Sequence, residues 1–351
     1  MLVFVPAVAA VEILAPQRPV VLFVCACAAI VPLAGWIGRA TEELADRIGE
    51  GLGGLLNATL GNLAELILGI AALRHGLTAV VKASLTGSIL GNLLLVLGAS
   101  FLVGGVRHHT LCFNATAARA QSSMLTLAVI ALLAPAAFHA VAAHNPGATG
   151  LSLAIAFVLI ATYACGLLFS LRTHRRLFLG AGCRASEAVA VPADFVPWSL
   201  GRSLGVLAGA TVLTGWISEA LAGVIEPAAH ALGITDLFVG VVVLAVIGNA
   251  AEHATAVKVA YHDRADLAVG IAVGSSMQVA LLVAPVLLLV SFFVGPRPMD
   301  LVFSGAEALA LAAAVAIAGQ VASDGESNWL EGVQLLAVYL VLAALFFFLP
   351  G

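Results

Sequence analysis

Two glutamates lie inside long apolar segments of the chain and are the only charged residues there. Glu65 falls within residues 51–73, and Glu252 falls within residues 237–257. An ionisable side chain in the middle of such a segment is energetically costly, so its presence indicates a function. The two glutamates are therefore the first candidates for chemistry.

The same local string surrounds both glutamates. It reads Gly-Asn-x-Ala-Glu, and a Gly-Ser pair follows in which the Ser lies 26 residues after the Asn. The copies are GNLAE at 61–65 with Gly87-Ser88, and GNAAE at 248–252 with Gly274-Ser275. An offset of 187 residues relates every position of the first copy to the second, which indicates an internal repeat.

The residue types of this repeat suit a hard cation and protons. Residues three apart share a helix face, so the Asn of each string lies beside its Glu. The next helix adds Ser88 and Asn92 in the first copy, and Ser275 and Gln278 in the second. Carboxylate, amide and hydroxyl oxygens without thiols are ligands for Ca²⁺ or a similar ion. Two carboxylates neutralise one divalent cation or hold two protons, whereas desolvation and repulsion disfavour the doubly ionised pair alone. The pattern predicts exchange of a cation for protons.

Helix packing is the alternative interpretation of the same residues. Small residues let helices approach closely, and Asn and Ser hydrogen-bond between them. For Ser88, Ser275 and the glycines both interpretations stay open. Packing has no need of a charge, so the functional interpretation is favoured for Glu65 and Glu252.

The composition identifies the class of protein that holds these strings. Of 351 residues, 62% are hydrophobic and 10% are charged, against about a quarter charged in a soluble domain. Charge-free stretches of 20 to 30 residues occur at 19–38, 83–106, 145–171 and 267–296, and each can cross a hydrocarbon core of about 30 Å. The sequence predicts an all-α, polytopic membrane protein and excludes a soluble enzyme, a secreted disulfide scaffold and a nucleic-acid binder.

Apolar runs between polar breaks predict about eleven transmembrane helices. They cover residues 1–15, 19–38, 51–73, 77–105, 118–138, 149–171, 199–222, 237–257, 266–294, 301–320 and 329–349. Segment 41–50 is predicted as an amphipathic lead-in to the third helix at the membrane surface. The longest polar stretch, 172–198, is basic and divides the chain into halves of similar size.

The distribution of basic residues predicts the orientation. With 172–198 in the cytoplasm and loops alternating, eleven Arg and Lys residues fall inside and four fall outside, which is the expected asymmetry. The inner set is Arg39, Arg47, Arg107, Arg119, Arg172, Arg175, Arg176, Arg184, Arg202, Lys258 and Arg264, and the outer set is Arg18, Arg74, Lys82 and Arg297. The N-terminus is then cytoplasmic and the C-terminus outside. The two Gly-Asn-x-Ala-Glu helices run in opposite directions, an arrangement used by secondary transporters.

Longer strings resemble the cation/proton exchanger (CAX) family of the calcium/cation antiporter superfamily. They are ATEELADRIGEGLGGLLNATLGNLAELILG (40–69), KASLTGSILGNLLLVLG (82–98), VGVVVLAVIGNAAEHATAV (239–257), VGSSMQVALLVAPVLLLVS (273–291) and SNWLEGVQLLAVYL (327–340).

The resemblance implies one N-terminal helix followed by two inverted five-helix repeats. The corresponding domains are 1–18, 19–171, a basic cytoplasmic linker at 172–198, and 199–351. It also implies that helices 19–38 and 199–222 tilt to alternate access. The implied central cation site comprises Asn62, Glu65, Ser88, Asn249, Glu252, Ser275 and Gln278.

The sequence therefore predicts a Ca²⁺/H⁺ antiporter of the bacterial inner membrane, a transporter and not an enzyme. Ca²⁺ and H⁺ are its expected partners as transported substrates, together with the lipid bilayer, and no cofactor and no nucleic acid are indicated. An oligomer is compatible with the sequence, which does not specify one.

Three rival functions remain. An exchanger of Mn²⁺, Cd²⁺, Na⁺ or K⁺, or a Na⁺-coupled Ca²⁺ exchanger, could use the same scaffold. Relatives coupled to Na⁺ typically carry a Thr-Ser-x-Pro-Glu string in place of Gly-Asn-x-Ala-Glu, which favours protons here. A passive cation channel would need a continuous polar pore, and the apolar helices disfavour one.

Several further residues are weaker candidates. Asn92 and His253 lie beside the predicted site, and His253 could relay protons or hydrogen-bond a neighbouring helix. Glu219 is predicted near the outer opening, and Glu42, Glu43 and Asp46 near the cytoplasmic one. The other histidines, among them His108 and His109, fall in predicted loops without a specific role.

Overall fold

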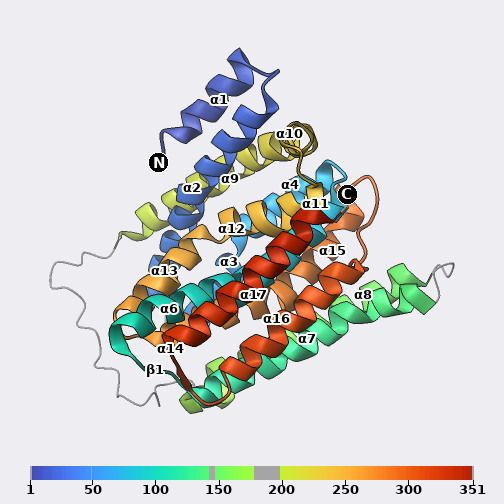
Figure 1. Ribbon diagram of the computed structural model, residues 1–351. Coiled ribbons are helices and arrows are strands. Elements are labelled where there is room, and N and C mark those ends of the chain that lie inside the picture. Colours follow the sequence, from blue (N-terminus) through green and yellow to red (C-terminus); the bar gives the residue numbers. More distant parts are fainter. Residues whose placement is uncertain (1, 49, 142–146, 178–197, 350–351) are drawn as a thin grey trace.

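The computed structural model describes residues 2–48, 50–141, 147–177 and 198–349. In this part of the chain nearly all residues are helical, and Figure 1 shows the helices in chain order. The first stretch contains α1 (Phe4–Leu14), α2 (Pro19–Ile48), α3 (Glu50–Leu60), α4 (Leu63–Arg74), α5 (Thr78–Leu90), η1 (Gly91–Val96), α6 (Leu97–His108), β1 (Leu111–Cys112), α7 (Ala115–Val141), α8 (Ala148–Leu168), η2 (Phe169–Thr173) and η3 (Arg175–Leu177). The second contains α9 (Leu200–Ala222), α10 (Ile225–Leu232), α11 (Asp236–Phe238), η4 (Val239–Leu244), α12 (Ala245–Gly248), α13 (Ala250–Tyr261), α14 (Ala265–Gln278), η5 (Val279–Val283), α15 (Ala284–Val294), α16 (Gly305–Val321), β2 (Glu326–Ser327) and α17 (Trp329–Phe348).

The predicted all-α membrane architecture is confirmed. Within the described residues, seven helices are long and apolar enough to cross a membrane, and a bent pair, α10 with α11–α12, is an eighth candidate. The other predicted crossings correspond to shorter helices, since α1 and α16 have 11 and 17 residues and 51–73 is divided between α3 and α4. Each of the eleven predicted segments thus has a helical counterpart.

The two Gly-Asn-x-Ala-Glu helices are broken at the asparagine, although each was predicted from the sequence as one continuous helix. Asn62 has φ −93° and ψ 20°, and Asn249 has φ −102° and ψ 6°, both outside helical geometry. A new helix starts directly after each, since the Asn62 carbonyl accepts from the Leu66 amide and the Asn249 carbonyl from the His253 amide. Each break brings an Asn side chain and a Glu on the first turn of the next helix to the same level.

Wide π-helical turns follow the two Gly-Ser pairs at matching places. η1 starts at Gly91, three residues after Ser88, and η5 starts at Val279, four residues after Ser275. Such turns insert an extra residue into the helix and are frequent at functional sites. No feature of the sequence analysis indicated them.

Two glycines allow the helices that carry the site to meet. A Cβ atom at Gly87 would overlap the backbone carbonyl of Val241, and a Cβ at Gly240 would overlap the Cβ of Ala83. α5 and η4 therefore touch along their backbones, one residue away from Ser88. This close approach is the role that the helix-packing interpretation gives to small residues.

α2 and α9 pack side by side along the upper side of the molecule in Figure 1, with α1 and α10 against them. α17, α16, α7 and α8 lie on the opposite side of the same view, and the broken helices lie between the two groups. The two helices that the family resemblance names as the moving pair are thus neighbours.

The prediction of a separate amphipathic lead-in at 41–50 was wrong, because α2 continues without interruption to Ile48. The extension stays helical because part of it is buried: the Glu43 carboxylate accepts a hydrogen bond of 2.9 Å from the Trp198 amide. Arg47 donates to the carbonyl of Trp198, and the rings of Trp36 and Trp198 lie 5.7 Å apart. The start of α9 is therefore fastened to the end of α2.

Candidate functional site

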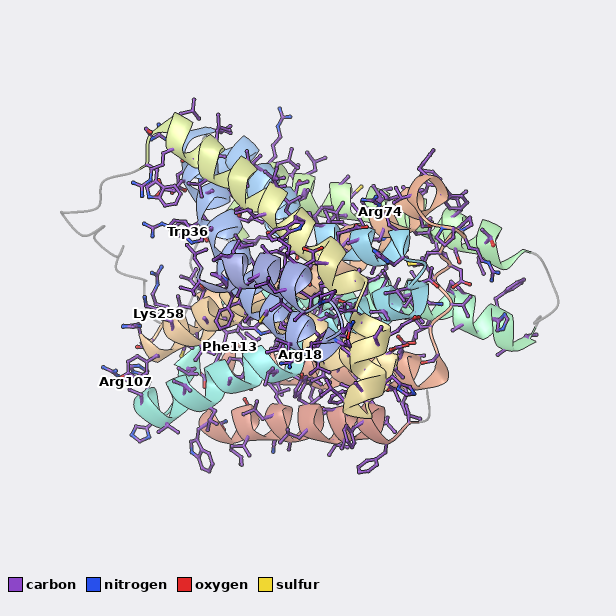
Figure 2. All side chains as sticks on the ribbon, turned by 90° about the horizontal axis from the view of Figure 1, so that it is seen from above. Arg18, Trp36, Arg74, Arg107, Phe113 and Lys258 are labelled. Atoms are coloured by element: carbon purple, nitrogen blue, oxygen red, sulfur yellow. The ribbon has the colours of Figure 1, made fainter. Side chains whose placement is uncertain are left out.

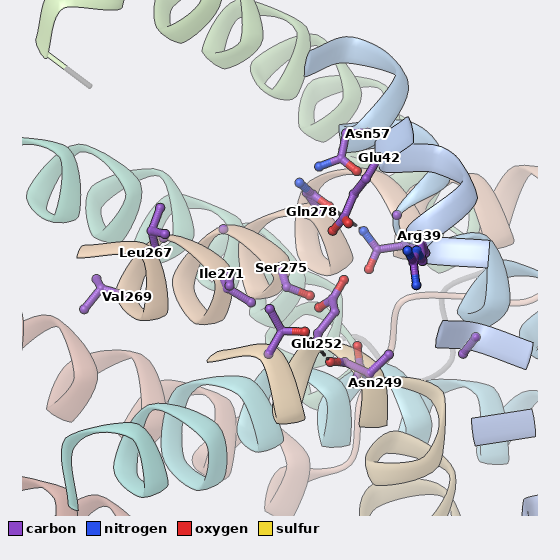
Figure 3. A pocket seen from close by; sticks show the side chains of 18 of the residues that line it. Arg39, Glu42, Asn57, Asn249, Glu252, Leu267, Val269, Ile271, Ser275 and Gln278 are labelled. Carbon is purple, nitrogen blue, oxygen red and sulfur yellow. Dashed lines mark hydrogen bonds between the residues drawn. The ribbon is translucent and has the colours of Figure 1, made fainter. Parts of the chain in front are cut away.

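Glu65 and Glu252 lie at the inner end of one cavity of about 870 Å³. The cavity is lined by residues of α2, by both broken helices, and by α7 and α14. Figure 3 shows Asn249, Glu252 and Ser275 together on one side of it, and Gln278 close to Glu42 and Asn57. Of the seven predicted site residues, all but Ser88 line this cavity.

The Glu65 carboxylate is held by donors from two other helices. Its Oε1 accepts a hydrogen bond of 2.5 Å from the Ser88 hydroxyl and one of 2.6 Å from the Asn249 side-chain amide. The same amide lies 3.0 Å from the Ser88 hydroxyl and 3.0 Å from the Ala245 carbonyl. Ser88 thus belongs to the site through Glu65, and the second broken helix positions the glutamate of the first.

A chain of three side chains leads toward the Glu252 carboxylate. The Ser275 hydroxyl lies within hydrogen-bonding reach of Glu252, next to it in Figure 3. Ser275 accepts a bond of 3.0 Å from the Asn92 amide. The Asn92 oxygen lies 3.2 Å from His253 Nε2. Because an amide oxygen only accepts, His253 Nε2 is the donor of that bond, and the whole chain points toward Glu252.

The two copies of the site differ in the side chains that follow the Gly-Ser pairs. Asn62 donates a bond of 2.5 Å to the Gln278 oxygen, whereas the position 187 residues before Gln278 is Gly91 and offers no side chain. Asn249 bonds to Glu65 and Ser88 instead. Asn92 likewise has an apolar counterpart, Val279.

Three buried oxygen atoms of the site have no hydrogen-bond partner among the described residues. They are Asn62 Oδ1, Glu65 Oε2 and Glu252 Oε2. A buried polar atom normally has a partner, since leaving it unpaired costs about 1–3 kcal/mol. Two carboxylate oxygens and one amide oxygen are the ligand types of a hard cation. The geometry can therefore hold such an ion, or protons on the same carboxylates.

The cavity leads from this site toward exposed residues on one face of the molecule. Its outer part is lined by Arg39, Glu42, Asp46 and Lys258, which are exposed. This is the place predicted for Glu42, Glu43 and Asp46, although Glu43 is buried and bonded to Trp198. On the other side of Glu65 the described residues enclose a space of about 20 Å³, lined mainly by apolar side chains such as Leu68, Leu85 and Leu287.

An ion pair joins α9 to α4 on that closed side. Glu219 lies 3.3 Å from Arg74 and 3.2 Å from His75 Nε2. Glu219 does not line the cavity that contains Glu65 and Glu252. Figure 2 shows Arg74 toward the end of the molecule opposite to Arg107, Lys258 and Trp36.

Comparison with known protein families gives a match over two stretches, residues 18–172 and 202–348, to the family described as sodium/calcium exchanger protein. The chain belongs to this exchanger family. The two matched stretches each contain one Gly-Asn-x-Ala-Glu string and one Gly-Ser pair.

Within the exchanger family, this chain is similar to proteins named as Ca²⁺/H⁺ antiporters. It is 46% identical over 342 residues to the Ca(2+)/H(+) antiporter of Aphanothece halophytica, covering 94% of this chain and 90% of that protein. It is 44% identical over 329 residues to the Ca(2+)/H(+) antiporter ChaA of Bacillus subtilis, covering 94% and 92%. The solved structure of native YfkE superposes with a TM-score of 0.83 at 41% identity, covering 99% of each chain. The predicted resemblance to cation/proton exchangers of the calcium/cation antiporter superfamily is confirmed.

Some contacts of this exchanger had no signal in its sequence. The offset of 187 shows that Gly91 and Val279 have no polar side chain where the other repeat has one. It does not show which side chains form hydrogen bonds. His253 was placed beside the site, yet its contact with Asn92 depends on how α13 faces η1. The Trp198 contacts join residues far apart in the sequence, 155 positions in the case of Glu43.

Proposed function

We propose that this multi-pass membrane protein is an antiporter that exchanges Ca²⁺ for H⁺. The observation that carries the proposal is the pair of glutamates, one from each broken helix, at the inner end of a cavity that opens to one face. Identities of 44–46% to proteins named as Ca²⁺/H⁺ antiporters, over most of each chain, support it. Both ions are substrates of this transport, and the protein is a transporter and not an enzyme.

Ca²⁺ and protons use the same side chains in this proposal. Glu65 and Glu252 supply two negative charges, which balance one Ca²⁺ or take up two protons. Asn62, with its unpartnered buried oxygen, adds a ligand, while Ser88, Asn249, Ser275 and Gln278 position the ligands. Because each loaded form is close to neutral, each can cross an apolar barrier that the doubly charged pair alone cannot. This makes net leak unfavourable.

Access alternates through movement of α2 and α9. The open cavity has α2 on one wall, and the ion pair from α9 to Arg74 closes the opposite side. Trp198 joins the two helices at their shared end through Glu43, Arg47 and Trp36. The pair then moves as one body, and opening the far side requires Glu219 to leave Arg74.

We infer that the open face is cytoplasmic and that the membrane is the bacterial inner membrane. Arg39, Lys258 and Arg202 belong to the predicted inner set of basic residues, and the cavity opens on the side of the first two. The N-terminus is then cytoplasmic and the C-terminus outside. Inward proton flow drives Ca²⁺ out of the cell.

The domain division follows from the repeat. We propose an N-terminal helix at 1–18, repeats at 19–171 and 199–351, and a linker at 172–198, of which 178–197 lies outside the described residues. Helix breaks at Asn62 and Asn249, and π-helical turns after Ser88 and Ser275, support this division.

Ca²⁺ uptake by reconstituted vesicles tests the function. The full chain is placed in liposomes with an acidic interior, without Na⁺ on either side, and Ca²⁺ accumulation is followed. Accumulation that a protonophore stops is the expected result, with protein-free liposomes as the control. Uptake that follows an imposed Na⁺ or K⁺ gradient and ignores pH would replace the proposal with an exchanger coupled to that ion.

A further inference from the structure

A second concave site lies on the outside of the helix bundle, away from the transport cavity. It is a shallow, open groove lined by Leu102, Val103, Val106, Arg107 and Tyr261, here called the α6–α13 groove. Val103, Val106 and Tyr261 are exposed, with 37%, 64% and 43% of their surfaces accessible. α6 can lie this close to α13 because a glycine, Gly104, faces the Ala260 carbonyl; a Cβ there would be 2.9 Å from that oxygen.

The groove runs from the apolar surface of a transmembrane segment to its end. Residues 78–108 form one candidate span, and Arg107 and His108 are in its last turn. Figure 2 shows Arg107 at the same end of the molecule as Lys258. An exposed apolar strip that ends in Arg and Tyr at this level matches the boundary between the hydrocarbon and the headgroups of a bilayer.

The polar end of the groove is a prearranged set of donors. The Arg107 guanidinium lies over the Tyr261 ring, 4.2 Å from its centroid. Stacking uses the face of the guanidinium and leaves its N–H edges directed outward. His108 Nε2 donates a bond of 3.0 Å to the Tyr261 carbonyl, which fixes the end of α13 against α6. These contacts hold the Arg107 guanidinium and the Tyr261 side chain next to each other.

Arg107 differs from Arg74 and Lys82, two other basic residues at the ends of membrane-spanning helices, which each pair with a carboxylate. Arg74 pairs with Glu219 at 3.3 Å, and Lys82 pairs with Asp300 at 2.9 Å. No carboxylate of the described residues forms an ion pair with Arg107. Among the described residues its charge is thus balanced by no acidic side chain, and a planar guanidinium suits a phosphate group.

We propose that the α6–α13 groove binds one anionic phospholipid, with its phosphate on Arg107 and the Tyr261 hydroxyl. One acyl chain lies along Val103 and Val106. The apolar strip selects a lipid over free phosphate, and the unpaired arginine selects an anionic headgroup over a zwitterionic one. The site is independent of the proposed transport function, since no groove residue lines the transport cavity.

Native mass spectrometry of the full chain tests this site. The detergent-solubilised protein is mixed with equal amounts of phosphatidylglycerol and phosphatidylcholine, and retained lipids are counted. The variants are Arg107→Gln, Arg107→Lys and, as a matched control, Arg172→Gln, another exposed arginine of the predicted inner set. Melting temperatures of all variants are measured in parallel.

The wild type and Arg172→Gln should retain one phosphatidylglycerol in preference to phosphatidylcholine. Arg107→Gln should reduce that preference about fivefold, which corresponds to about 1 kcal/mol for one cationic side chain near an anionic lipid surface. Arg107→Lys should keep most of it, and inorganic phosphate should not displace the lipid. Equal lipid preference in the wild type and Arg107→Gln, both folded, would show ordinary annular lipid only and overturn the proposal. Equal loss in Arg172→Gln would do the same.

Discussion

The side-chain amide of Asn249 donates a hydrogen bond of 2.6 Å to the carboxylate of Glu65, 184 residues earlier in the chain. Asn249 is the residue at which the helix of the second repeat is broken, between α12 and α13. Glu65 lies three residues after Asn62, where the helix of the first repeat is broken. The glutamate of one repeat is therefore held by the asparagine of the other. Movement of one broken helix relative to the other would therefore change the hydrogen bonds of Glu65 directly.

Removing either carboxylate charge should abolish exchange. Glu65→Gln and Glu252→Gln keep the volume of the side chain but cannot alternate between a proton and a cation. We expect Ca²⁺/H⁺ exchange below detection in both variants. Melting temperatures should stay close to that of the wild type, because neither carboxylate has a basic partner among the described residues that would be left unpaired. Glu226→Gln, at an exposed carboxylate, is the control and should keep full activity. Near wild-type exchange in both site variants would remove these glutamates from the mechanism.

The hydrogen-bond chain to Glu252 should behave as one unit. His253→Ala and Asn92→Ala each interrupt the chain from His253 through Asn92 to Ser275. A neutral hydrogen bond contributes about 0.5–1.5 kcal/mol, so each variant should lower apparent Ca²⁺ affinity by about 2- to 10-fold. The double variant should lose no more apparent Ca²⁺ affinity than the single variant with the larger loss, since both substitutions remove the same interaction. Asn57→Ala, which lines the cavity outside this chain, is the comparison. Strictly additive losses for His253 and Asn92 would argue against a shared chain.

The repeat made part of this site predictable and left another part unpredictable. Two isolated charges in apolar segments, spaced by 187 residues with matching Asn and Ser, identify six of the side chains that meet. The orientation of the broken helices decides the rest. Asn62 and Asn249 occupy equivalent positions, yet one bonds Gln278 and the other bonds Glu65, because position 91 has no side chain. Local sequence also misled at 41–48, where charges suggested a surface segment while a long-range partner, Trp198, keeps Glu43 buried inside α2.

The ion pair on the closed side should bias the exchanger toward the conformation described here. Glu219→Gln removes the charge that faces Arg74 and His75. Exposed ion pairs are worth about 0.2–1 kcal/mol, so the equilibrium should shift by up to about fivefold toward opening of the opposite face. The readout is the labelling rate of a cysteine placed at Leu85, beside the small closed space, in a background without native cysteines. Glu226→Gln should leave this rate unchanged. An unchanged rate in Glu219→Gln would mean that the pair does not hold that side shut.

Trp198 should couple α2 to α9. Arg39 and Arg202 stack on its ring at 4.9 and 4.5 Å, in addition to its contacts with Trp36, Glu43 and Arg47. Trp198→Ala should destabilise the protein by about 3–5 kcal/mol, as for other buried tryptophans, and should slow transport more than it weakens Ca²⁺ binding. Thermal melting and transport assays check both effects. Trp329→Ala is the control, since Trp329 is 49% exposed. A larger loss of stability in the control would contradict the account.

The central claim is that Ca²⁺ and protons compete for Glu65 and Glu252, and proton release on Ca²⁺ binding measures this directly. Ca²⁺ is added to the purified full chain in weakly buffered solution, and released protons are counted across a range of pH. At low pH the carboxylates hold protons, so Ca²⁺ binds weakly and each binding event should release up to two protons. As pH rises and the carboxylates ionise, apparent affinity should increase and proton release should decline. Glu65→Gln and Glu252→Gln should reduce or abolish both the binding of Ca²⁺ and the release of protons. Tight Ca²⁺ binding without proton release at any pH, or unchanged release in the two variants, would contradict the account.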